Sequence, residues 1–190
     1  VPPGGNVSTQ DALVIINPAA KRARFCEPTR ARRLLEGLSI RAEIVVTKHP
    51  DEPASEARAR GFGRVIVVGG DGTLRSVVAA ARLPVALVPA GTSNSVARSL
   101  GIPLAADAAL ELAARGRPRR VDAGELVGPR VPGGRLIFLL CASAGPDAEV
   151  VRRYEASRVA RSGVLRYALA ALRVAAGYEP RPISVSVDGR

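Results

Sequence analysis

The sequence predicts an α/β fold, a doubly wound parallel sheet with helices on both faces, followed by the start of a second, β-rich domain. Four short apolar runs between residues 12 and 88 alternate with segments of helical period, which is the pattern of parallel strands joined by helices. Beyond residue 121, two strand-like runs are separated by the Gly/Pro-rich turn GPRVPGG, which is typical of a β-hairpin. This change places a domain boundary near residue 122.

The first part of the chain alternates strand and helix. Apolar runs predict strands at residues 12–16, 40–46, 65–68 and 85–88. Leucine spacing and Ala/Arg/Glu-rich composition predict helices at residues 28–38, 52–60, 74–81, 93–100 and 105–114. The helix at 93–100 is expected to be capped by Ser93 or Asn94. We therefore assign residues 8–121 to one α/β domain, whose ligand should bind at the carboxyl ends of the strands.

The second part has a different pattern. Residues 121–127 and 136–142 are predicted strands of a hairpin, and residues 150–176 are predicted to be mostly helical with a break at 162–163. Residues 183–187 alternate like a strand that enters a hairpin, for which the chain holds no second arm. We expect residues 122–190 to be the beginning of a second domain that is incomplete here.

The composition indicates a basic protein with an aliphatic core. The 190 residues are 47% hydrophobic and 3% aromatic, and 28 Lys and Arg against 17 Asp and Glu give a net charge of +11. Such a charge favours phosphorylated ligands, polyanions or anionic membranes. The arginines are dispersed and not interleaved with aromatic residues, so no specific nucleic-acid role is expected. Arg152 and Arg153 form either a solvated helix face or a contact with an anionic membrane.

The two cysteines, Cys26 and Cys141, have neither metal-site spacing nor the density of a disulfide scaffold. Reduced thiols are typical of cytoplasmic proteins. No run approaches the roughly 20 apolar residues of a membrane span. We expect a cytoplasmic location, with peripheral contact at the inner face of the membrane as the open alternative.

The segment GGDGT, residues 69–73, follows the third predicted strand directly. Glycines at such a corner let the backbone approach a phosphate group and present its N–H groups, and the following helix adds a positive dipole end. An acid in this place is understandable if a divalent cation lies between Asp71 and the phosphates. The alternative is a tight turn in which Asp71 caps its own helix through Thr73 or Leu74.

A second loop of the same kind follows the next predicted strand. It supplies Gly91, the Thr92 hydroxyl and the Asn94 amide just before a helix. Successive parallel strands that each end in a Gly-Thr loop would form two walls of one phosphate-sized cleft. The arrangement is neither a Walker loop nor the GxGxxG fingerprint of dinucleotide sites.

These motifs resemble those of the diacylglycerol kinase catalytic domain superfamily, which includes bacterial lipid kinases and sphingosine kinases. The segments that carry the resemblance are INP (16–18), VVGGDGT (67–73), PAGTSNSVARSLGIP (89–103), VDAG (121–124) and FLLCASAGPDAEVV (138–151). Their order and spacing make the resemblance specific, and it covers nearly the whole chain. It implies that the region after residue 121 is the opening of a β-sandwich-like second domain.

The resemblance also implies an activity, an ATP-dependent transfer of the γ-phosphoryl group to the hydroxyl of a lipid at a membrane surface. The nucleotide-binding residues that it implies are Asn17, Thr47, Gly69, Gly70, Asp71, Gly72, Thr73, Gly91, Thr92 and Asn94. Mg²⁺ would be bound through Asp71 and Asp122. The general base of the family would lie beyond Arg190, so we expect the N-terminal portion of a lipid kinase.

Besides the absent general base, three departures from the family pattern keep alternatives open. Ala19-Ala20 and Lys21-Arg22 stand where members often have Ser-Gly, Arg75-Ser76 stands in place of Asn-Glu, and Ser95 replaces an acid. Lys21 or Arg22 remains able to reach a phosphate. A member that binds nucleotide without catalysis is therefore one alternative. An NAD kinase, whose family also uses GGDGT, is the less favoured one.

Overall fold

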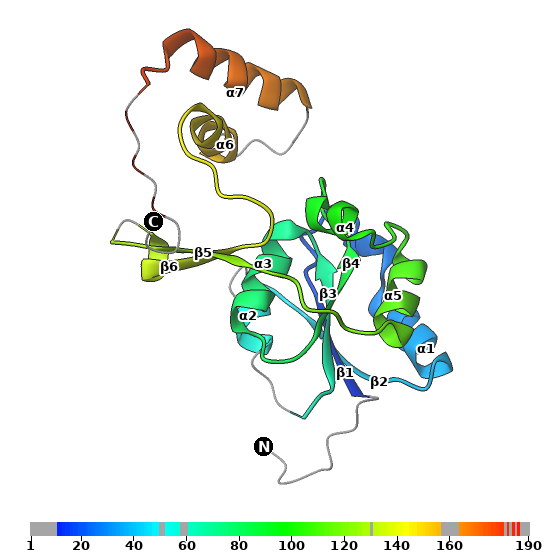
Figure 1. The fold of residues 1–190 in the computed structure, drawn as a ribbon. Coiled ribbons are helices and arrows are strands. Elements are labelled where there is room, and N and C mark those ends of the chain that lie inside the picture. Colours follow the sequence, from blue (N-terminus) through cyan, green and yellow to red (C-terminus); the bar gives the residue numbers. More distant parts are fainter. Residues whose placement is uncertain are drawn as a thin grey trace. The chain divides into compact units, whose positions relative to one another are not determined.

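The computed structural model describes residues 11–49, 52–57, 61–129, 131–156, 164–180, 182, 184 and 186. The chain divides after Leu140 into two compact units. The first contains a four-stranded sheet with its helices and a two-stranded sheet, and the second contains two helices (Figure 1). The predicted α/β class, with a small β-hairpin after the parallel sheet, is confirmed. The hairpin belongs to the first unit, and the assignment of residues 122–190 to a second domain stays a prediction.

The main sheet is built from the four predicted apolar runs. Its strands are β1 (Asp11–Ile16), β2 (Arg41–Val46), β3 (Arg64–Gly69) and β4 (Val85–Pro89). All pairs are parallel, in the order β2-β1-β3-β4. The register pairs Ile16 with Val46 and with Val68, so the strands end level with one another. The chain leaves β1 toward one edge and returns to its other side with β3, which creates a topological switch point between β1 and β3.

Helices cover both faces of this sheet (Figure 1). One face carries α1 (Pro28–Gly37) and α5 (Ala106–Arg115), and the other carries α2 (Glu52–Glu56) and α3 (Asp71–Ala80). Side chains alternate across a strand, so β3 packs Ile66 and Val68 against α1 and α5 but Val65 and Val67 against α2 and α3. Burial on both faces explains why β1 and β3 are continuous apolar runs.

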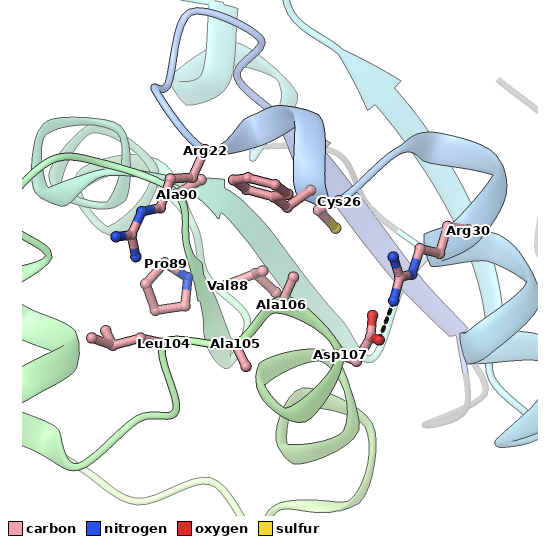
Figure 2. Close-up of a pocket in the computed structure, with 11 residues that line it drawn as sticks. Arg22, Cys26, Arg30, Val88, Pro89, Ala90, Leu104, Ala105, Ala106 and Asp107 are labelled. Atoms are coloured by element: carbon pink, nitrogen blue, oxygen red, sulfur yellow. Dashed lines mark hydrogen bonds and ion pairs between the residues drawn. The ribbon is translucent and has the colours of Figure 1, made fainter.

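The first face is also held by an ion pair. Arg30 of α1 pairs with Asp107 in the first turn of α5 (Figure 2). At the other end of α5, the Arg64 guanidinium donates hydrogen bonds to the carbonyl oxygens of Ala113 and Ala114 at 2.8 and 2.7 Å. These carbonyls lie in the last turn of the helix, where they have no partner within it. α5 is therefore fixed at both ends.

Two helices begin at residues other than those predicted. α3 starts at Asp71 rather than at residue 74, because Gly70 has an extended backbone (φ −95°, ψ −175°) and is the N-cap residue. α4 (Ser95–Leu100) starts two residues later than predicted. Asn94, its N-cap residue, has a left-handed backbone (φ 49°), and its side chain does not cap the helix. Of the predicted 52–60 helix, α2 covers Glu52–Glu56, and residues 58–60 lie outside the described residues.

The predicted hairpin is present and is shorter than expected. Strands β5 (Gly124–Val127) and β6 (Arg135–Phe138) pair antiparallel, and a turn of 3₁₀ helix, η2 (Pro132–Gly134), precedes β6. A side chain at Gly124 would collide with the ring of Phe138, its cross-strand partner. This close approach explains the glycine at the start of β5.

The second unit contains α6 (Pro146–Ala156) and α7 (Val164–Gly177). Val150, Ala170 and Val174 form their shared core, and the Tyr154 and Tyr167 rings meet edge to face at 5.8 Å. The helices predicted before and after the break at 162–163 are thus confirmed. The break itself, with residues 157–161 before it, lies outside the described residues. The strand predicted at 183–187 falls largely outside them as well.

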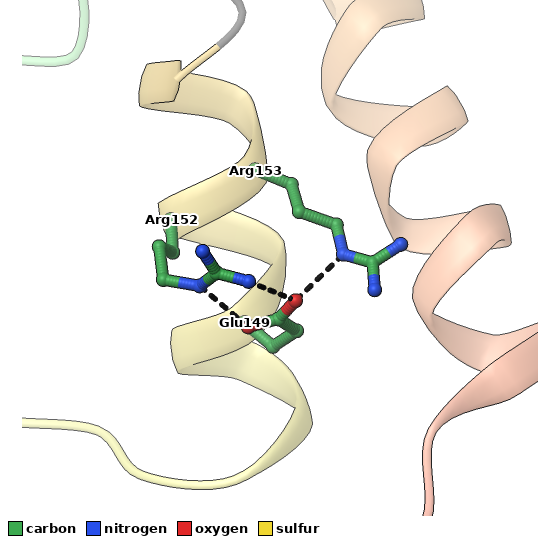
Figure 3. Close-up of polar contacts among 3 residues, drawn as sticks. All are labelled: Glu149, Arg152 and Arg153. Carbon is green, nitrogen blue, oxygen red and sulfur yellow. Dashed lines mark hydrogen bonds and ion pairs between the residues drawn. The ribbon is translucent and has the colours of Figure 1, made fainter.

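A cluster of charges on α6 bears on the predicted membrane contact. Glu149 accepts hydrogen bonds from Arg152 at 2.7 Å and from Arg153 at 2.6 Å (Figure 3). These bonds, first from Arg152 and then from Arg153, lower the pKa of Glu149 to about 2. The cluster carries a net charge of +1, which is a weak attraction for an anionic surface. Among the described helices, none has the length and apolar content needed to cross a bilayer.

The two cysteines should differ sharply in reactivity. Cys26 is 2% exposed, and burial, with a smaller contribution from Asp107, raises the pKa of its thiol to about 11. Cys141 is exposed. At pH 8 we expect iodoacetamide to modify Cys141 at least about a hundredfold faster than Cys26, because the thiolate is the reactive form. Mass spectrometry of time points measures both rates, and similar rates in the folded protein would contradict the burial of Cys26.

Candidate functional site

The predicted nucleotide-binding residues gather at the carboxyl edge of the main sheet. Asn17 follows β1, Thr47 follows β2, Gly69 ends β3, and Gly91 stands two residues after β4. Parallel strands that end level with one another bring these positions to a single edge. Asn17 follows β1 and Gly69 ends β3, the two strands that flank the switch point, where ligands of open α/β sheets bind.

Hydrogen bonds connect the loops along this edge. The Asn17 side-chain amide donates to the Thr73 hydroxyl oxygen at 2.9 Å, and its Oδ1 accepts the N–H of Ala19 at 3.0 Å. Asn17 thus joins the loop after β1 to the first turn of α3. Thr47 is buried, and its N–H and hydroxyl both donate to the carbonyl of Ile16, at 2.9 and 3.3 Å. Thr47 therefore holds the β2 loop beside β1.

The two glycine corners lie directly against each other. A Cβ placed on Gly91 would come within 2.6 Å of the Gly70 Cα, and a Cβ on Gly70 within 3.1 Å of the Gly91 Cα. The N–H of Ala90 donates to the carbonyl of Gly69 at 2.8 Å, which extends the β3–β4 pairing into the corners. This is the convergence of two Gly-Thr loops that the sequence predicts. Only residues without a Cβ permit it.

Asp71 connects the two corners in a way that the sequence did not indicate. Its Oδ2 accepts the N–H of Ser95 at 3.0 Å, and its Oδ1 accepts the N–H of Val96 at 3.0 Å. These are the first N–H groups of α4, which have no acceptor within their own helix. The predicted alternative, in which Asp71 caps its own helix, is therefore wrong in detail. Asp71 caps the neighbouring helix, because it stands inside the first turn of α3 and its side chain faces α4.

The loop after β4 is shaped by Asn94. This residue is 2% exposed, its Oδ1 accepts the N–H of Gly91 at 2.8 Å, and its Nδ2 donates to the carbonyl of Gly91 at 3.1 Å. The Asn94 amide is thus engaged within the loop, and its direct contact with a nucleotide stays a prediction. Thr92 and Ser93, between the two tethered residues, are exposed.

The amino end of α3 offers donors to an anion. The N–H groups of Asp71, Gly72 and Thr73 lie in its first turn and find no acceptor among the described residues. In α4, the N–H groups of Ser95 and Val96 are occupied by Asp71. An anion at this edge would therefore meet the amino end of α3, with exposed Thr92 on the adjoining loop.

Asp122, the second predicted magnesium ligand, is not held by other side chains of the described residues. Asp122 is exposed in the segment before β5 and forms no hydrogen bond or ion pair with any described residue. Within the described ranges, no group of three or more His, Cys, Asp or Glu side chains gathers to hold a metal ion. The pairing of Asp122 with Asp71 around a cation stays a prediction.

Two features of the site escaped sequence reasoning. The Ser95 and Val96 partners of Asp71 are backbone groups more than 20 residues away, so no residue-type pattern could reveal them. The loop after β1 is also tied to β4, since the N–H of Arg22 donates to the carbonyl of Ala90 at 2.8 Å. The basic pair Lys21-Arg22 was a feature of the sequence that indicated a functional role for the loop after β1.

The chain is similar to known proteins of one family. The model of the family "Diacylglycerol kinase catalytic domain" matches residues 11–126. The chain is 39% identical over 101 residues to the "Probable lipid kinase YegS-like" of Pseudomonas syringae pv. tomato, a match that covers 50% of this chain and 30% of that protein. It is 34% identical over 125 residues to the "Probable lipid kinase YegS" of Escherichia fergusonii, covering 60% of this chain and 41% of that protein.

A solved structure is similar in fold. The crystal structure of a diacylglycerol kinase from Bacillus anthracis superposes with a TM-score of 0.52 at 25% identity, over 60% of this chain and 45% of that one. The chain spans 30% and 41% of the length of the two curated relatives above. From the match of the family model over most of the first unit, the chain belongs to the diacylglycerol kinase catalytic domain family.

Proposed function

We propose that this chain is the nucleotide-binding portion of an ATP-dependent lipid kinase, which transfers the γ-phosphoryl group of ATP to a lipid hydroxyl. The observation that carries the proposal is the contact between Gly70 and Gly91 at the carboxyl edge of the sheet. It creates a corner without side chains beside the N–H groups of α3 that have no acceptor in the described part of the chain. Phosphate groups need such close backbone approach and such donors.

Phosphoryl transfer depends mainly on positioning and on neutralising charge. In this proposal, the α3 N–H groups and the Thr92 hydroxyl bind the phosphates, and Thr47 and Asn17 fix the loops on which the rest of the nucleotide lies. Asp71 and Asn94 would act as positioning residues, since they hold the Gly91 loop and α4 in register with α3. Lipid acceptor and membrane contact are proposed on family membership.

The residues present are compatible with Mg²⁺. Each Asp71 oxygen accepts one N–H group, which leaves a lone pair free for a cation or its water. Mg²⁺ retains several waters and takes other ligands from substrate phosphates, so one or two carboxylates are sufficient. Asp71, with Asp122, would hold the ion, which would neutralise phosphate charge when bound.

The test has a binding arm and a transfer arm. We expect the 190-residue chain to bind ATP saturably in calorimetry, more tightly with Mg²⁺ than without it. We expect the complete gene product to transfer ³²P from ATP to diacylglycerol, sphingosine or phosphatidylglycerol in mixed micelles. A chain that is folded by circular dichroism and binds no ATP in either condition would overturn the proposal.

The transfer arm also decides the main alternative, a family member that binds nucleotide without catalysis. Ser76 and Ser95 favour this alternative: the Ser76 hydroxyl donates to the Gly72 carbonyl at 3.2 Å, and Ser95 contributes its backbone N–H to Asp71, so neither side chain supplies a carboxylate. ATP binding without transfer to any of the three lipids would support it. Family membership makes an NAD kinase the less favoured alternative.

A further inference from the structure

A pocket of about 400 Å³ lies on the α1 and α5 side of the sheet, at the end of β4 (Figure 2). Its floor is formed by Val88, Pro89 and Ala90. None of the predicted nucleotide-binding residues lines it. The pocket is therefore distinct from the corner formed by Gly70 and Gly91, and the proposed function does not account for it.

The charges around the pocket favour an anion. Arg22 lines it from the loop after β1, and its side chain extends beside Pro89 (Figure 2). The Arg22 guanidinium forms no hydrogen bond or ion pair with any described residue. Arg30 also lines the pocket, where it is paired with Asp107. Two guanidinium groups thus face one carboxylate, and Arg22 is available to a ligand.

The remaining walls are apolar. Phe25, from the 3₁₀ turn η1 (Ala23–Phe25), lines the pocket together with Leu104 and Ala105, which precede α5. Phe25 is 54% exposed, and the Arg24 guanidinium covers its ring at 5.0 Å. An exposed ring beside a concave apolar surface is typical of a binding site for a ligand with an apolar body.

We propose that this pocket binds a single-chain anionic amphiphile, with its charged head on Arg22 and its alkyl chain between Phe25 and Leu104. The pocket volume of about 400 Å³ is near the lower limit for small-molecule sites, which favours a ligand with one alkyl chain over a ligand with two. The ligand would contact Ala90, whose neighbour Gly91 forms the phosphate corner. A phosphate monoester and a carboxylate share the required chemistry, and the experiment separates them.

The chain contains no tryptophan, so Phe25→Trp introduces a single fluorescent reporter in the pocket wall. The variant is titrated, below the critical micelle concentration, with dodecyl phosphate, dodecanoate, dodecanol and inorganic phosphate. We expect saturable changes in emission with the two anionic amphiphiles, at affinities at least about tenfold higher than for dodecanol or phosphate. The ratio of the two amphiphile affinities distinguishes a phosphate head from a carboxylate head.

Matched charge variants test the assignment to Arg22. In the Phe25→Trp background, Arg22→Gln is expected to weaken amphiphile binding about tenfold. Arg33→Gln removes an exposed arginine of α1 that does not line the pocket, and should leave the affinity within about twofold. Calorimetry on the chain with Phe25 intact shows whether the reporter itself alters binding.

Three results would overturn the proposal. They are the absence of saturable binding by both amphiphiles in calorimetry and fluorescence, an equal loss of affinity in Arg22→Gln and Arg33→Gln, and competitive displacement of the amphiphile by ATP. The last would assign the pocket to the nucleotide site. Failure of ATP binding alone would contradict the proposed function and leave the amphiphile measurement unaffected.

Discussion

Gly91→Ala is expected to lower stability and nucleotide affinity together. The added Cβ would lie 2.6 Å from the Gly70 Cα and 3.0 Å from the Asn94 Oδ1, so the two corners must separate. Overpacking against backbone costs about 2 kcal/mol, which corresponds to a fall of about 4–8 °C in Tm for a chain of this length. ATP affinity should fall at least about tenfold, since phosphate donors must be held in place. Differential scanning fluorimetry and calorimetry measure the two effects.

Gly72→Ala is the matched control for stability. Apart from its chain neighbours and the backbone of α3, nothing lies within 4 Å of a Cβ at Gly72, which is in the first turn of α3. Its Tm should be unchanged or higher, because Ala favours the helix over Gly by up to about 1 kcal/mol. If Gly91→Ala and Gly72→Ala have the same Tm, the contact between Gly70 and Gly91 does not exclude a Cβ at residue 91. A stable Gly72→Ala that has lost ATP binding would support close approach of the phosphates to this backbone.

Asp71→Ala should have the second largest effect. It removes both acceptors for the N–H groups of Ser95 and Val96, and the loss of such a cap costs about 1–2 kcal/mol. Asp71→Asn retains one side-chain acceptor and should recover about half of this stability. It carries no charge, so the increase in ATP affinity on adding Mg²⁺ should be lost in both variants. Urea unfolding measures stability, and ATP titrations with and without Mg²⁺ measure the affinity.

Ser95→Ala provides the control for the cap. The donor to Asp71 is the backbone N–H of Ser95, which Ala keeps, so stability should change by less than about 0.5 kcal/mol. If Asp71→Ala is as stable as Ser95→Ala, the bridge between α3 and α4 contributes nothing. If Asp71→Asn keeps the full effect of Mg²⁺, Asp71 is a positioning residue without a role toward the cation.

The site was predictable as far as it depends on residue type and order. Glycine at 69, 70, 72 and 91 and threonine at 73 and 92 follow apolar strands, and parallel strands bring their carboxyl ends to one edge. The role of Asp71 was not predictable, because its partners are backbone groups of α4, and backbone groups leave no signature in the sequence. Asn94 likewise uses its amide within the Gly91 loop rather than as the cap of α4.

The fold, like the site, has features that the sequence predicted and features that it did not. Burial on both faces explains why β1 and β3 could be predicted from continuous apolar runs. The edge strand β2 carries exposed Arg41 and Glu43, and its prediction depended on the apolar residues 44–46. The start of α3 at Asp71 was missed. It depends on the extended backbone of Gly70, and glycine can adopt many other backbone conformations, so the residue type does not reveal this one. The pocket beside Arg22 was also missed, since it is assembled from residues 22–30, 88–90 and 104–107.

The sequence by itself determined the parallel α/β fold and the two glycine-threonine corners, because these depend on local apolar period and on residues with unusual backbone freedom. It also indicated the family, through the resemblance of its motifs to those of known members. Only the tertiary structure decided that Asp71 caps α4, that Gly70 touches Gly91, and that Arg22 lines a pocket where it pairs with no described residue. Each of these is a contact between distant segments. Its existence depends on strand order and helix packing, which bring together groups that have no relation along the chain.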